Sequence, residues 1–205
     1  MAGTKDSILK TALKLFNEVG TPNVSQRAIT DLLKISPGNL TYHFKKKEDI
    51  ETELYFRLVS KIDSQLKLSG HSVSTVRLLV NQLDGLMNAF FEYRFIFLDF
   101  VHIMRNNKTI AEFHLQLFKK RRDQFNGIIT RYVEAGIFRK EELANEYQYL
   151  YERLAILSDF WILEAEITRN GVKKTHLKKY RNIILYSIYP YLTERGQNEF
   201  FALIQ

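Results

Sequence analysis

The stretch SQRAITDLLKISPGNLTYHF, residues 25–44, decides the fold, because it predicts two short helices joined by a tight turn. Ser25 and Ser36 suit the N-caps of these helices, since a serine hydroxyl accepts from the free amides of a first turn. Pro37 fits the first position of the second helix, where a missing N–H costs nothing. In that helix we expect one buried and one exposed face, namely Leu40 and Phe44 against Asn39, Thr41, Tyr42 and His43. A short helix with these two faces is typical of a reader of the DNA major groove.

An amphipathic segment precedes this motif and a basic segment follows it. Residues 5–19 place apolar side chains at helical spacing, and Gly20 is suited to end that helix. The apolar face expected for the first motif helix consists of Ile29, Leu32 and Leu33. Three lysines at positions 45–47 follow the second motif helix, where they can hold DNA phosphates. We therefore expect a three-helix DNA-binding domain over residues 1–48.

Residues 5–54 resemble the DNA-binding domain of the TetR family of bacterial transcriptional regulators. The residues that carry the resemblance are Ile8, Ala12, Phe16, Gly20, Ile29, Ser36-Pro37-Gly38-Asn39-Leu40, His43-Phe44 and Lys47-Glu48. Two positions depart from the family pattern: Lys34 stands where glycine is usual, and Thr41 where tyrosine is usual, with Tyr42 beside it. Either Thr41 or Tyr42 could therefore take the usual tyrosine contact. A non-glycine residue in a left-handed conformation at position 34 would cost on the order of 1 kcal/mol.

The DNA-binding face follows from the motif and the resemblance together. We expect it to comprise Gln26, Arg27, Ser36, Pro37, Gly38, Asn39, Thr41, Tyr42, His43 and Lys47. Asn39 and Thr41 are the candidates for contact with bases, whereas Tyr42, His43 and Lys47 are expected mostly at phosphates.

Composition agrees with a DNA partner. The chain has 205 residues, a net charge of +7 and no cysteine. The positive charge suits a polyanion, and the lack of cysteine excludes disulfides and thiolate metal sites. No run approaches about 18 apolar residues and the N-terminus carries no apolar signal segment. We therefore expect a cytoplasmic protein with no membrane partner.

Residues 49–205 are expected to form a second domain that is helical throughout. We expect helices over about 50–69, 74–91, 109–135, 142–170 and 175–189, with a short tail helix after Gly196. The predicted fold class is therefore all-α: a helix-turn-helix DNA-binding domain followed by a helical ligand-binding and dimerisation domain.

An aromatic-rich segment over residues 90–100 suggests a small-molecule site in this second domain. The expected pocket residues are Phe91, Phe95, Asp99, His102, Phe113 and Leu117. The alternative is that these rings only fill a helical core. The family resemblance implies a ligand, for which we expect a hydrophobic or amphipathic compound.

The last two long helices carry more apolar surface than one chain needs, and the resemblance implies that they pair in a homodimer. The expected interface residues are Leu157, Trp161, Tyr180, Ile184, Ser187 and Tyr191. The alternative places Trp161 and its neighbours inside the core of a single chain. A two-fold dimer presents two reading helices to one face of a duplex, so the expected operator is a palindrome.

Enzymatic motifs are lacking: there is no His-Glu-x-x-His, no phosphate-binding glycine loop and no nucleophile elbow. We expect no catalytic residue, no metal and no cofactor. The sequence favours a ligand-responsive repressor that binds a palindromic operator. The alternative is a basic helical interaction module for a membrane surface or a protein partner, because residues 119–122 and 173–181 are rich in lysine and arginine.

Overall fold

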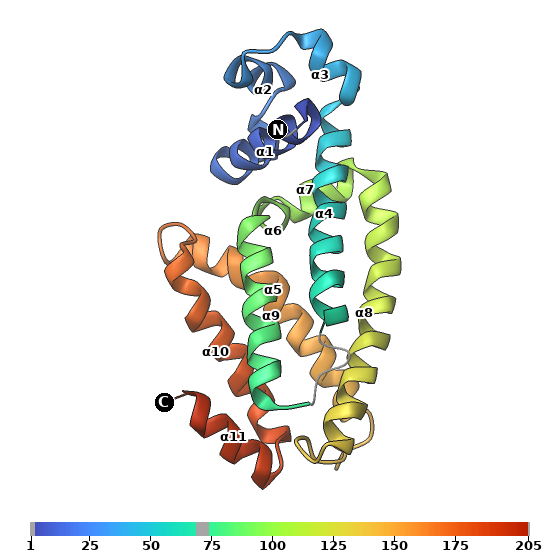
Figure 1. Cartoon of the computed structure of the whole chain (residues 1–205), viewed down its shortest axis with the longest axis vertical. Helices are drawn as coiled ribbons and strands as arrows, with labels where there is room; N and C mark the ends of the chain where they lie inside the picture. The colour runs from blue at the N-terminus through green and yellow to red at the C-terminus, as the bar shows by residue number, and fades with distance from the viewer. Residues whose placement is uncertain (1–2, 69–73, 205) are drawn as a thin grey trace. The chain divides into compact units, whose positions relative to one another are not determined.

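The computed structural model describes residues 3–68 and 74–204, which are almost entirely helical (Figure 1). The α-helices are α1 (Thr4–Val19), α2 (Gln26–Leu33), α3 (Pro37–His43), α4 (Lys47–Leu68), α5 (Val76–Glu92), α6 (Phe95–Leu98), α7 (Phe100–Asn106), α8 (Lys108–Glu134), α9 (Glu146–Thr168), α10 (Leu177–Ile188) and α11 (Glu194–Ile204). The described residues also contain the 3₁₀ turns η1 (Thr21–Asn23), η2 (Lys174–His176) and η3 (Tyr189–Tyr191). Extended pairing among the described residues is confined to one bridge between Phe138 and Leu192. The predicted all-α class is confirmed.

The chain folds as two compact units. The first comprises Met1–Lys61 with Glu92–His114, and the second Ile62–Phe91 with Leu115–Gln205. Helices α4 and α8 each contribute residues to both units. The boundary expected after residue 48 lies in the first turn of α4, and the end expected for that helix near residue 69 lies outside the described residues.

The capping interactions expected from the sequence set the ends of α2 and α3. The hydroxyl of Ser25 accepts from the backbone N–H of Ala28 at 3.1 Å, and that of Ser36 from the N–H of Asn39 at 3.2 Å. Lys34 ends α2 in the left-handed conformation, with a φ of 55°. The turn between α2 and α3 therefore has the expected form, with a lysine in a conformation that favours glycine.

Buried aliphatic and aromatic side chains hold the first unit together. Its buried residues include Ile8, Leu9, Ala12, Phe16, Ile29, Leu40, Phe44, Ile50, Leu54, Phe95 and Ile103. The ring of Phe16 on α1 lies 5.2 Å from that of Phe95 on α6, measured between centroids. The expectation for Leu32 is wrong: its side chain is 55% exposed, because the buried face of α2 consists of Ile29 and Thr30.

The second unit is built from long helices whose aromatic side chains meet. Trp161 of α9 and Tyr180 of α10 have ring centroids 5.1 Å apart, and Tyr151 of α9 packs against Phe118 and Phe125 of α8. Some boundaries differ from those expected. Helix α9 begins at Glu146 rather than near residue 142, and α11 begins two residues before Gly196. The lack of a side chain at Gly196 matters there, since a Cβ would lie 2.4 Å from the Ile137 carbonyl oxygen.

The late start of α9 has an electrostatic cause. Arg139 donates to both carboxylate oxygens of Glu146, at 2.9 and 2.7 Å, and the N–H of Glu142 donates to the same carboxylate at 2.9 Å. These contacts hold the connection before α9 in a turn. Hydrogen bonding from Arg139 lowers the pKa of Glu146 from 4.5 to about 2.

This ion pair makes stability depend on pH in a defined window. A carboxyl whose pKa is lower in the folded state stabilises the fold above pH 4.5, and that contribution is lost as the pH falls towards about 2. We expect Glu146→Gln to lower the free energy of unfolding at pH 7 and to match the parent below pH 2, as measured by urea denaturation. Glu142→Gln is the control, because Glu142 is 70% exposed and its contact with Arg139, at 3.5 Å, is longer than the 2.7 Å contact of Glu146. A deficit in Glu146→Gln that stays constant from pH 7 to pH 2 would contradict this assignment.

Candidate DNA-binding interface

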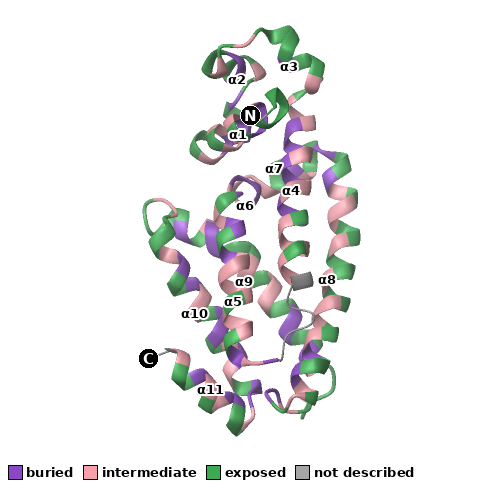
Figure 2. Cartoon of the chain, viewed as in Figure 1, coloured by how far each residue is buried: buried purple, intermediate pink, exposed green. Residues whose placement is uncertain are grey.

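Helix α3 presents most of its side chains to solvent (Figure 2). It has seven residues, of which Leu40 is buried, and Phe44 follows it as a buried C-cap. Asn39 and Thr41 are exposed, and Tyr42 is 86% exposed. The exposed face is therefore polar and aromatic, as expected.

The predicted DNA-binding residues lie at the start of α2, along α3 and at the start of α4. Several of them also make contacts within the chain. Gln26 donates to the Phe44 carbonyl oxygen at 3.1 Å, which ties the start of α2 to the end of α3. Arg27 is exposed and lies 3.8 Å from Asp31. Ser36, Pro37 and Gly38 form the exposed start of α3.

Thr41 and Tyr42 differ in how free their hydroxyl groups are. The hydroxyl of Thr41 donates to the Pro37 carbonyl oxygen at 2.9 Å, a bond within α3 itself. The ring of Tyr42 meets that of the half-buried His43 edge-on, with centroids 5.1 Å apart. Of these two residues, Tyr42 is therefore the one whose polar end extends away from the helix.

Lys47 is bound to the turn that follows α1. Its ammonium group donates to the carbonyl oxygen of Thr21 at 2.6 Å. On the other side, a carboxylate oxygen of Asp99 accepts from the N–H of Thr21 at 2.6 Å and from its hydroxyl at 3.0 Å. Thr21 is fully buried, so these three bonds satisfy polar groups that water cannot reach.

Asn17 near the end of α1 makes a second connection to the segment that contains α6. Its side chain donates to the Glu92 carbonyl oxygen at 2.7 Å and accepts from the N–H of Phe95 at 3.0 Å. Asn107 likewise donates to the Glu48 carbonyl oxygen and to the Thr52 hydroxyl of α4. Residues 92–107 are thus hydrogen-bonded to α1, η1 and α4, a connection that sequence spacing did not reveal.

Comparison with known families agrees with this geometry. Residues 8–54 match the family of bacterial regulatory proteins named tetR, and residues 57–200 match the bacterial transcriptional repressor family TetR. The chain belongs to the TetR family. It is therefore a DNA-binding transcriptional regulator and not an enzyme.

Individual relatives support the same assignment for this TetR-family chain. The HTH-type transcriptional regulator QacR of Staphylococcus aureus is 28% identical over 147 residues, which cover 70% of this chain and 73% of QacR. A TetR-family regulator from Marinobacter aquaeolei VT8 has the same fold, with a TM-score of 0.90, 24% identity and coverage of 98% and 97% of the two chains. A regulator from Saccharomonospora viridis, solved with choline, has a TM-score of 0.70 and 21% identity, with 93% and 98% covered.

Three of the basic residues that suggested a different interaction module pair within the chain. Lys120 and Arg121 both contact Asp63, and Arg181 contacts Asp84. Over residues 3–68 and 74–204, no helix is long and apolar enough to cross a membrane. The same residues contain no group of His, Asp or Glu side chains arranged to hold a metal ion. The alternative of a basic module is therefore not favoured.

The residues expected to line a ligand pocket fall in both units of this TetR-family chain. Phe91 and Leu117 are half-buried in the second unit. In the first unit, Phe113 packs edge-on against Phe56, and His102 is exposed. Two residues need correction. Phe95 is fully buried against Phe16, and the Asp99 carboxylate binds Thr21, so both make structural contacts within the first unit.

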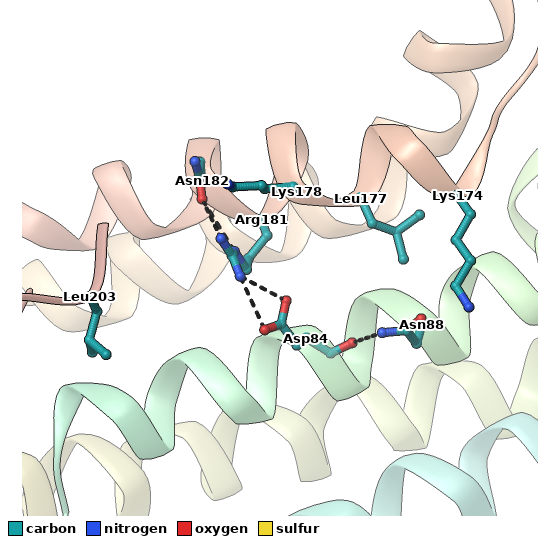
Figure 3. A pocket seen from close by; sticks show the side chains of 8 residues that line it. All are labelled: Asp84, Asn88, Lys174, Leu177, Lys178, Arg181, Asn182 and Leu203. Atoms are coloured by element: carbon teal, nitrogen blue, oxygen red, sulfur yellow. Dashed lines mark hydrogen bonds and ion pairs between the residues drawn. The ribbon is translucent and has the colours of Figure 1, made fainter. Parts of the chain in front are cut away.

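A polar pocket of about 500 Å³ lies in the second unit (Figure 3). Its lining residues are Asp84, Asn88, Lys174, Leu177, Lys178, Arg181, Asn182 and Leu203. Arg181 points from α10 to Asp84 of α5 and donates to both carboxylate oxygens, at 3.1 and 3.2 Å. The pocket contains none of the expected aromatic residues, and its arginine is already paired.

The expected dimer residues also need correction. Trp161, Tyr180, Ile184 and Tyr191 are at most 7% exposed in a single chain, so they are core residues, and Leu157 and Ser187 are half-buried. The opposite sides of the same helices carry exposed apolar residues: Tyr149, Ile156, Phe160 and Ile167 on α9, with Ile183 and Tyr186 on α10. The α9 residues recur at intervals of seven, four and seven, a helical period that the sequence contained. We call these six residues the apolar stripe.

The bonds around Thr21 predict a measurable effect on stability. Asp99→Ala leaves the buried N–H and hydroxyl of Thr21 without an acceptor, so we expect it to lower the free energy of unfolding by about 2 kcal/mol. Asp99→Asn retains a carbonyl oxygen as an acceptor, so it should lower the free energy of unfolding by less. Asp123→Ala, at an exposed position of α8, should match the parent in urea denaturation. Equal stability of the parent and Asp99→Ala would contradict the structural role of this carboxylate.

Proposed function

We propose that this chain represses transcription by binding a palindromic operator as a homodimer and releasing it when a small molecule binds. The observation that carries the proposal is the exposed polar and aromatic face of α3. A helix of this kind enters the major groove and contacts bases with its first turns. The nearby exposed Lys45 and Lys46 and the half-buried Lys47 supply positive charge for phosphates.

The proposed DNA-binding face keeps the ten residues inferred from the sequence, with roles assigned from their surroundings. Asn39 is exposed at the start of α3 and is the candidate for base contact. Tyr42 takes the contact that tyrosine usually makes, because the Thr41 hydroxyl is already bonded within the helix. Lys47 exchanges its bond with the Thr21 carbonyl for a phosphate when DNA is present.

Selection of bound sequences from a random duplex pool tests the DNA-binding face. We expect a palindrome with half-sites roughly 34–36 Å apart. Lys47→Ala should weaken binding to all sequences alike and reduce the salt slope by about one. Asn39→Ala should instead reduce discrimination between sites. Lys108→Ala, at an exposed position of α8, is the control for charge loss. If Lys47→Ala and Asn39→Ala both bind like the parent, the DNA-binding face lies elsewhere.

The apolar stripe is the surface that we propose for the homodimer. Its six large apolar side chains are between 39% and 73% exposed in a single chain. Helices α9 and α10 lie against each other, so two copies can bury the stripe in a bundle of four helices. An interface with two-fold symmetry brings the same patch of each chain together.

A charged substitution in the apolar stripe tests this interface. Phe160→Glu should give folded monomers with weak operator binding, since a charge cannot be buried unpaired and each chain then holds one half-site. Light scattering after size exclusion, circular dichroism and DNA binding measure the three properties. Leu143→Glu is the control, because Leu143 is 71% exposed outside the apolar stripe. Ile184→Glu is unsuitable, since Ile184 is 2% exposed and the charge would disrupt the core. A dimeric Phe160→Glu protein would contradict the proposal.

The ligand in this proposal is a hydrophobic or amphipathic compound. Structural relatives solved with choline and with triclosan support a small organic molecule. Helices α4 and α8 extend into both units, and residues 92–107 are bonded to α1, to η1 and to α4. A shift of these elements on ligand binding would move the reading helices, so ligand and DNA oppose each other through one two-state element.

A further inference from the structure

The polar pocket of the second unit carries more positive charge than its own residues balance (Figure 3). Among the described residues that line it, Lys174, Lys178 and Arg181 are cations and Asp84 is the one carboxylate, so the lining has a net charge of +2. The ion pair between Arg181 and Asp84 accounts for one charge of each sign. The surplus charge therefore resides on the two lysines.

Lys174 and Lys178 line the pocket with ammonium groups that have no partner within the described chain. Over residues 3–68 and 74–204, neither side chain makes a hydrogen bond or an ion pair. The two lysines lie four residues apart along η2 and α10, and Arg181 follows three residues later, which is the spacing of one helix face. The side chain of Lys174 extends toward Asn88 of α5 (Figure 3). Two unpaired cations thus share one hollow.

Arg181 adds a hydrogen-bond donor whose direction is fixed. Its Nη1 donates to both carboxylate oxygens of Asp84, and its Nε and Nη2 donate to the side-chain oxygen of Asn182, at 3.2 and 3.0 Å. These contacts hold the guanidinium group from two sides. Because Nη2 has two N–H groups and Asn182 takes one of them, one N–H of Arg181 stays available in the pocket lining.

We propose that this pocket binds a small polar molecule that carries a doubly charged anionic group, such as a phosphate. Two unpaired ammonium groups match two negative charges, since lysine binds phosphate as a point charge and an arginine N–H adds a directed bond. The volume of about 500 Å³ lies in the range of small-molecule sites. The inference goes beyond the proposed response to a hydrophobic compound, because the aromatic residues expected for that compound do not line this pocket.

The test compares three sugar compounds that differ in charge. At pH 7.5 glucose 6-phosphate carries about two negative charges, gluconate carries one and glucose carries none. Calorimetry of the full chain at low salt, where charges are least screened, should give a dissociation constant about tenfold lower for glucose 6-phosphate than for gluconate. Glucose should not bind.

Variants of the lysines assign this binding to the pocket. Lys178→Gln should raise the dissociation constant of glucose 6-phosphate about tenfold, and the double variant Lys174→Gln/Lys178→Gln should lose binding. Lys179→Gln is the matched control for Lys178→Gln. It removes the same charge one residue further on, but Lys179 lies over the ring of Tyr180, 4.8 Å from its centroid, and outside the pocket lining. Circular dichroism checks that each variant is folded.

Any of four results would overturn the inference: no binding of glucose 6-phosphate to the parent, equal affinity for gluconate, unchanged binding in the double variant, or an equal loss in Lys179→Gln. Nucleic acid is the other source of phosphate. If the parent does not bind glucose 6-phosphate and the double variant reduces the salt slope for duplex DNA by about two, these lysines contact DNA instead. Operator selection without sugar on the same preparation distinguishes failure of the proposed DNA binding from failure of this anion site.

Discussion

The reading helix is too short to hold its own shape, and the rest of the first unit compensates for that constraint. An isolated helix of seven residues is unstable in water, because nucleation costs more than so few hydrogen bonds return. Helix α3 is therefore held from outside. Ser36 caps its start, Gln26 binds the carbonyl at its end, and Leu40 and Phe44 anchor one side. The opposite side is left to solvent and hence to DNA.

Hydrogen bonds also connect the elements around α3 to residues far away in the sequence. Thr21, in the turn after α1, is held by Lys47 from one direction and by Asp99 from the other. Asn17 and Asn107 bond the same distant segment to α1 and α4. The DNA-binding part is thus connected to residues 92–107 by hydrogen bonds as well as by the chain itself. A regulator needs such a connection, because a ligand can act on DNA binding only through elements that both sites share.

Two faces of helix α9 meet different surroundings. One face, with Trp161 and Ile162, fills the core of the second unit. Another carries the apolar stripe, in which Phe160 is 59% exposed. Because consecutive residues turn by about 100° around a helix, neighbouring positions such as 160 and 161 meet different surroundings.

The sequence by itself determined the local structure and the family: the caps at Ser25 and Ser36, the left-handed Lys34, the all-α class and the TetR resemblance depend on short-range patterns. The residues proposed for the DNA-binding face could be named from the sequence because they lie within one continuous motif. The tertiary structure alone decided which face of α9 and α10 is buried, so that Trp161 and Ile184 belong to the core. The hydrogen bond between Asp99 and Thr21 is likewise known only from the tertiary structure. Both outcomes depend on contacts between distant segments, and apolar periodicity shows that a face is apolar without showing what covers it.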